Sequence, residues 1–221
     1  VRCENPNVGS LLENTIVKLR TEDLLYNLRR PNDYGETDKE RYFNVSLDLV
    51  ITWLNRILFL KLLEAQLVAY NIEDTDKDEF RFLCSSKVTE FDAVNTLFFE
   101  VLALPEKERE KHITKEYGRI PYLNSSLFEI TNLERQTLRI SNIKDSTKLP
   151  LYEKTVLKTA DGKSLRSNET TELPTLQYLL DFLEAYDFGL ETTDSVLKPV
   201  TKPLINTAVL GLIFEKLNGY K

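Results

Sequence analysis

The string FNVSLDLVITWLNRILFLKLLEAQLVAY, residues 43–70, has the strongest helical periodicity in this 221-residue chain. Its apolar side chains recur every three to four residues, which is typical of an amphipathic helix. Other apolar residues, such as Trp53 and Leu60, lie outside that stripe, so we expect a helix that is buried on most sides. Charged residues interrupt the run, which argues against a membrane span. The main stripe consists of Leu47, Val50, Ile51, Leu54, Ile57, Leu58, Lys61, Leu62 and Ala65.

Weaker patterns flank this segment. We expect helices over residues 11–20, 21–30, 89–104, 106–117, 173–186 and 204–217, with a turn at 31–35 and a charge-rich loop up to 41. Residues 137–143 alternate like a strand, and residues 155–158 followed by Asp161-Gly162 predict a β-hairpin. The predicted fold class is therefore mainly α, with several helices and a small β-hairpin insertion.

We divide the chain into four parts. They are an N-terminal entry segment (1–30), a helical core (31–134), a small basic β-hairpin region (135–170) and C-terminal helices (171–221).

Hydrophobic residues make up 42% of the chain, which is enough to build a core. The net charge of −6 argues against a surface that binds nucleic acid all over.

Cysteine and histidine are rare. Two cysteines and one histidine provide neither a disulfide framework nor a metal site, and free thiols fit a reducing cytoplasm. The chain opens at Val1 without a signal-peptide pattern, so we expect a fragment of a longer cytoplasmic protein.

Catalytic motifs are absent from the sequence. Adenine-N6 methylation needs an Asn/Asp-Pro-Pro-Tyr/Phe loop that holds the flipped base, and this chain has no Pro-Pro pair. Asp161-Gly162-Lys163 has the short pattern of a nuclease metal site, but Asp-Gly is more typical of a hairpin turn. We therefore assign no catalytic, cofactor-binding or metal-binding residue.

Basic residues gather in one part of the chain. Between Arg135 and Arg166 there are eight basic and three acidic residues, a net charge of +5 in a chain of −6. Such a region can contact DNA phosphates, although lysines on an exposed hairpin can also serve only solubility and edge protection. The candidate DNA-binding residues are Arg135, Arg139, Lys154, Lys158, Lys163 and Arg166.

Several strings carry a family resemblance: LRRPND (28–33), RILFLKLLE (56–64), NTLFFEVL (95–102), IPYLNSSLFE (120–129) and the terminal helix. Together they resemble the segment that leads into the methyltransferase domain of bacterial DNA adenine-N6 methyltransferases, above all type IIG restriction-modification enzymes. Ser125-Ser126 stands where such enzymes commonly have Gly-Gly.

The resemblance implies a multi-helix connector domain that is not catalytic alone. The parent enzyme would methylate adenine N6 with S-adenosylmethionine and cut DNA with Mg²⁺, and neither cofactor would be bound by these residues. Its partners would be DNA and the flanking nuclease and methyltransferase domains of the same chain, with no membrane. The alternative is a free-standing helical protein-interaction module without a nucleic-acid role.

Overall fold

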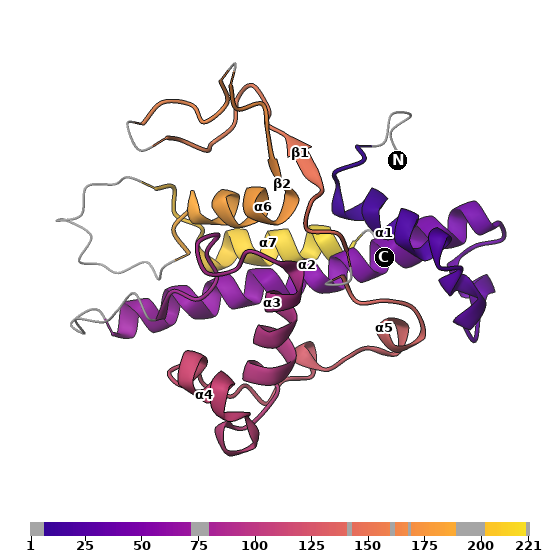
Figure 1. Ribbon diagram of the computed structural model, residues 1–221, viewed down its shortest axis with the longest axis horizontal. Coiled ribbons are helices and arrows are strands. Elements are labelled where there is room, and N and C mark those ends of the chain that lie inside the picture. Colours follow the sequence, from indigo (N-terminus) through magenta and orange to yellow (C-terminus); the bar gives the residue numbers. More distant parts are fainter. Residues whose placement is uncertain are drawn as a thin grey trace.

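The computed structural model describes residues 7–71, 80–140, 143–159, 162–167, 169–188 and 202–219. A long helix, α2 (Asp38–Tyr70), runs across the molecule, and the other elements pack around it (Figure 1). At 1.5 Å per residue, its 33 residues span about 50 Å. The predicted mainly α fold is confirmed, and none of the described helices is long and apolar enough to cross a membrane.

Helix α2 begins five residues before the predicted start at residue 43 because of a capping box. The Thr37 hydroxyl accepts a hydrogen bond from the Glu40 backbone N–H, and the Glu40 carboxylate accepts one from the Thr37 N–H. These two bonds satisfy backbone donors that the first turn leaves free. The predicted charge-rich loop therefore ends at Thr37.

The N-terminal region contains one regular helix, α1 (Leu11–Thr21), at the predicted position, and this helix packs against α2. The helix predicted for residues 21–30 is wrong. Asp23 adopts a left-handed conformation with φ of 51°, which ends the helical path, and only a 3₁₀ turn follows at Leu24–Asn27. A second 3₁₀ turn at Pro31–Tyr34 leads into α2.

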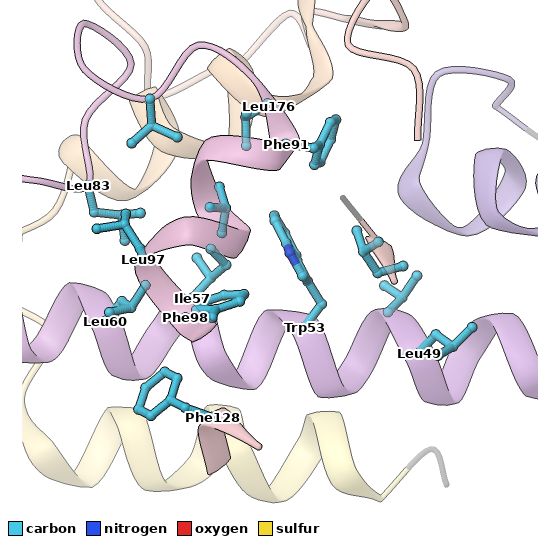
Figure 2. Packing of buried hydrophobic residues seen from close by; sticks show 14 of the residues in the cluster. Leu49, Trp53, Ile57, Leu60, Leu83, Phe91, Leu97, Phe98, Phe128 and Leu176 are labelled. Carbon is cyan, nitrogen blue, oxygen red and sulfur yellow. The ribbon is translucent and has the colours of Figure 1, made fainter. Parts of the chain in front are cut away.

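The helix predicted for residues 89–104 forms in two geometries. α3 (Phe91–Asn95) continues into a π-helix at Thr96–Leu102, whose wider turn buries Leu97, Phe98, Val101 and Leu102. Figure 2 shows this segment over the middle of α2, with Phe91 beside Trp53 at 5.8 Å between ring centroids. Both rings belong to the apolar core.

The helix predicted for residues 106–117 is broken. A 3₁₀ turn at Glu106–Glu108 and α4 (Lys111–Tyr117) are separated by Arg109 in an extended conformation. The Arg109 side chain turns inward and donates to the carbonyls of Leu104, Tyr117 and Ile120. The buried arginine thus closes this loop on itself, which helical periodicity could not indicate.

The segment after α4 returns to α2. A 3₁₀ turn at Ser126–Phe128 buries the Phe128 ring completely, and α5 (Asn132–Gln136) follows with a capping box of its own. Residues 137–140 form no strand, so that part of the predicted strand 137–143 is wrong, and residues 141 and 142 lie outside the described residues. The alternation reflects burial of Leu138 and Ile140 on an irregular segment.

The β structure is larger than predicted. β1 (Lys148–Pro150) pairs antiparallel with β2 (Glu172–Pro174), a pairing that the sequence pattern did not reveal. Beyond this pair lies the predicted hairpin, closed by the bridge Lys158–Ser164 and by Gly162 at φ of 80°. Asp161 itself lies outside the described residues.

Two helices complete the fold near the positions predicted for them. They are α6 (Thr175–Glu184) and α7 (Thr207–Asn218). α7 contacts α2, and the Asn55 amide donates a hydrogen bond of 3.1 Å to the Asn218 side-chain oxygen. The last helix of the chain is thereby joined to α2.

Candidate nucleic-acid interface

The six candidate DNA-binding residues lie in two separate regions. Lys154, Lys158, Lys163 and Arg166 belong to the hairpin at the upper left of Figure 1, whereas Arg135 and Arg139 belong to α5 and the segment after it at the lower right. Helix α2 runs between the two regions. The structure therefore does not bring the six together into one surface.

The hairpin group is exposed and is held by backbone hydrogen bonds. The Leu165 N–H donates to the Leu157 carbonyl and the Thr159 N–H donates to the Lys163 carbonyl, each at 2.9 Å. Leu157 within the hairpin is buried, whereas Lys154, Lys158 and Lys163 are exposed, so the lysines project from an anchored loop. Arg166 also lies 3.7 Å from the Glu153 carboxylate, which partly neutralises that end.

Arg139 is half-buried and contacts an aromatic ring of the protein. Its guanidinium lies 5.8 Å from the centre of the Phe99 ring, a cation–π geometry that fixes the side chain on the protein. Arg56 contacts the same ring at 5.2 Å. Arg139 therefore contributes to packing of the segment after α5.

Arg135 on α5 faces a recess that the sequence pattern did not predict. The recess has a volume of about 460 Å³. It is lined by Leu28, Arg29, Arg30, Asp33, Tyr34, Asn132, Arg135 and Gln136. The sequence signal for it is the pair Arg29-Arg30 before Pro31, a basic pair followed by a turn.

The inner side of α5 holds a buried ion pair. Glu134 accepts two hydrogen bonds from the Arg56 guanidinium, at 2.5 and 2.9 Å, and both side chains are almost fully buried. Arg56 also donates to the carbonyls of Leu127 and Glu129 at 2.7 Å. This arginine on α2 thus holds both the 126–128 turn and α5 in place.

The electrostatics of Glu134 follow from these contacts. Burial alone raises the pKa of the Glu134 carboxyl. The hydrogen bonds and charge of Arg56, with further hydrogen bonds from Thr131, outweigh burial and hold the pKa below its usual value. Glu134 is therefore a charged structural group at neutral pH.

A second buried ionic cluster fixes α6 on α2. Lys61 donates to Glu64 at 2.6 Å and also to Glu184 at the end of α6. Glu64 in turn accepts the Leu83 N–H at 2.6 Å. Lys61 and Glu64 interrupt the apolar run of α2 in the sequence. In the structure they are buried and form ion pairs and hydrogen bonds inside the protein.

The described residues offer no metal centre. Within them, no group of three or more His, Cys, Asp or Glu side chains is arranged to hold a metal ion. His112, the one histidine, is exposed on α4 beside Glu110. The described surface does present groups of cationic side chains on the hairpin and around the recess.

Comparison with known proteins gives a distant relative and a family. The chain is 26% identical over 207 residues to a Methanocaldococcus jannaschii protein provisionally named a type II restriction enzyme and methyltransferase. This match covers 89% of the chain but only 14% of that protein's length. No solved structure matches the chain significantly. The family model described as "Domain of unknown function (DUF7814)" matches residues 2–205, and the chain therefore belongs to the DUF7814 family.

Proposed function

We propose that this chain is a non-catalytic helical connector of a restriction-modification enzyme. The observation that carries the proposal is the match to the Methanocaldococcus jannaschii protein, which takes in most of this chain but 14% of the relative. The rest of that relative is long enough to contain the restriction and methylation parts that its name gives. The lack of an Asn/Asp-Pro-Pro-Tyr/Phe loop in this sequence supports the same division of labour.

The architecture suits a part that holds other parts at fixed distances. A packed helix of about 50 Å transmits position far better than a flexible linker. A buried ion pair ties α5 to this helix, a partly buried one ties α6 to it, and the Asn55–Asn218 hydrogen bond ties α7 to it. The chain can therefore act as one rigid support.

In this proposal the complete enzyme methylates adenine N6 with S-adenosylmethionine and cleaves DNA with Mg²⁺. Both cofactors belong to the nuclease and methyltransferase domains that the connector joins, within a cytoplasmic enzyme. The connector itself would contact DNA through Lys154, Lys158, Lys163 and Arg166 on the hairpin and through Arg135. Arg139 would support that surface through its contact with Phe99.

The test uses the complete polypeptide that contains these residues. Incubation with duplex DNA and radiolabelled S-adenosylmethionine should yield N6-methyladenine. The variant Asn55→Ala, which loosens α7 from α2, should slow methylation of DNA but leave the Kd for S-adenosylmethionine unchanged by calorimetry. Gln177→Ala, an exposed change on α6, is the matched control and should do neither.

Two results would contradict the proposal. If the complete polypeptide transfers no methyl group to DNA, the protein-interaction module becomes the better interpretation. If Asn55→Ala weakens S-adenosylmethionine binding as much as it slows methylation, the chain is part of the cofactor site and is not a separate connector.

A further inference from the structure

The recess beside α5 is built by two segments that are far apart in the sequence. The Arg29 backbone N–H donates to the Gln136 side-chain oxygen at 2.9 Å, across a separation of 107 residues. Leu28 and Leu133 are buried next to these residues and anchor each segment in the core. The two walls are thus held together before any ligand arrives.

One wall is stiffened by hydrogen bonds from α2. Arg41 donates to the Asn32 side-chain oxygen at 2.8 Å and to the Gly35 carbonyl at 3.0 Å. The Asn44 amide donates to the Tyr34 carbonyl at 2.8 Å. These bonds hold the 3₁₀ turn at residues 31–34, so the recess is preorganised on that side.

The charges in the recess are unbalanced. Three arginines, Arg29, Arg30 and Arg135, line it together with a single acidic residue, Asp33. In the part of the chain that the structure describes, these three groups have no ion pair or side-chain hydrogen bond. Arg41 and Arg56, by contrast, are each paired with a carboxylate.

Like charges gathered around one recess without a partner repel one another, and an anion in the recess offsets that repulsion. Guanidinium forks match the oxygen geometry of phosphate and bind it through two parallel hydrogen bonds. Tyr34 and Asn132 add polar groups to the lining. A volume of about 460 Å³ is ample for a phosphate group with part of the chain that carries it.

We infer that this recess binds a phosphate group through Arg29, Arg30 and Arg135, and that the phosphate belongs to the backbone of duplex DNA. The choice of DNA as the source rests on the proposed function, whereas the phosphate chemistry rests on the recess alone. The chain as a whole is acidic, at −6, so binding at this place depends on the local cluster and not on net charge.

The test compares two variants with the same change of charge. The complete polypeptide with Arg29→Gln, Arg30→Gln and Arg135→Gln is set against one with Lys107→Gln, Lys111→Gln and Lys115→Gln, whose exposed lysines lie in and just before α4. Binding of a fluorescein-labelled duplex is followed by anisotropy over a range of salt concentrations. Inorganic phosphate is titrated separately while the arginine Nε–Hε signals are observed by NMR.

The arginine variant should bind the duplex at least about tenfold more weakly, since it lacks the hydrogen bonds that charged guanidinium groups donate. Its slope of log K against log salt should flatten by about 0.9 if it neutralises one phosphate fewer. The lysine variant should keep the affinity of the unmodified protein. Replacing the three arginines with lysine should restore the slope but only part of the affinity, because lysine keeps the charge and lacks the fork.

Two other outcomes would distinguish the claim of a phosphate site from the claim that the phosphate belongs to DNA. If the unmodified protein shows phosphate-induced arginine shifts that the arginine variant lacks, but this variant binds duplex normally, the recess takes a free phosphate compound and the DNA source is wrong. If the unmodified protein shows no arginine shifts and both variants bind duplex equally well, the recess is not a phosphate site. The connector proposal survives that outcome, because it is tested by methyl transfer and not by this recess.

Discussion

The arginines on the two sides of α5 have opposite environments. On the inner side, Arg56 is buried and donates to the Glu134 carboxylate and to two carbonyls. On the outer side, Arg135 joins Arg29 and Arg30 around an open recess with one carboxylate. Glu134 and Arg135 are neighbours in the sequence, so adjacent residues of one short helix serve two different purposes.

The difference shows how the surroundings determine what a charge does. A buried arginine must have its donors satisfied, or it destabilises the fold, so Arg56 holds together the segments that surround it. Exposed arginines can remain unpaired in water and keep their donors for a ligand. Variants on the inner side should therefore change stability, and variants on the outer side should change binding.

The largest effect is expected at Arg56. Arg56→Met leaves Glu134 buried without its partner and should lower the free energy of unfolding by about 3–5 kcal/mol. Urea unfolding followed by circular dichroism measures this change. Arg166→Ala removes only a surface ion pair and should stay within about 1 kcal/mol of the unmodified protein.

A double variant sharpens this prediction. Arg56→Met combined with Glu134→Leu removes both charges, so it should be less destabilised than Arg56→Met alone. Equal or greater destabilisation would show that the other hydrogen bonds lost in the double variant, from Arg56 to the Leu127 and Glu129 carbonyls and from the Thr131 N–H to Glu134, matter more than the unpaired carboxylate.

The next effect concerns Glu134 and pH. Because the folded pKa of Glu134 lies below its value of 4.5 in the unfolded chain, its contribution to stability is complete above about pH 4.5 and is lost as pH falls toward the folded pKa. Glu134→Gln should lower the free energy of unfolding at pH 7 by about 1.5–3 kcal/mol. It should also make the stability fall less steeply as the pH drops below about 4.5.

The change in slope should be partial, because a second, half-buried carboxylate behaves similarly. Burial raises the pKa of Glu184, but Lys61, Lys202 and Arg81 outweigh it and lower the pKa overall. Chemical unfolding at several pH values measures both contributions. An unchanged acid dependence in Glu134→Gln would mean that Arg56 does not stabilise the charged carboxylate.

The hairpin provides the contrast with the recess in binding. Reversal of Lys154, Lys158 and Lys163 to glutamate should weaken duplex binding by about tenfold and flatten its salt slope by about 0.9 for each phosphate that the variant no longer neutralises. Anisotropy titrations measure this, with Lys107, Lys111 and Lys115 reversed as the control. An unchanged slope would leave the hairpin as a solvated loop and place DNA contact elsewhere.

The smallest effect is expected where the two walls of the recess meet. Gln136→Ala removes the acceptor of the Arg29 N–H and should lower the free energy of unfolding by only about 0.5–1.5 kcal/mol. Binding of inorganic phosphate should nevertheless weaken, because the two walls of the recess are less well fixed. Gln177→Ala on α6 is the control, and phosphate affinity equal in the two variants would contradict a preorganised recess.

Local patterns in the sequence were sufficient for the main helices and for the hairpin. The apolar repeat of residues 43–70 predicts α2, and the capping box at Thr37 and Glu40 was a readable signal for its true start. The same reasoning missed the pairing of β1 with β2, because the hairpin and its flanking residues lie between the two strands in the sequence. It also missed the break in the helix at Arg109. The side chain of this residue donates to the carbonyls of Leu104 and Ile120, which lie outside its own turn.

By itself, the sequence determined a mainly helical chain with a basic hairpin and without the motif for adenine methylation, since periodicity, turn chemistry and composition are local properties. Only the tertiary structure decided that Glu134 points inward to Arg56 while Arg135 faces Arg29 and Arg30. Which charges become buried and paired depends on how segments far apart in the sequence pack together. That packing divided the six predicted DNA contacts into two regions and assembled the recess beside α5.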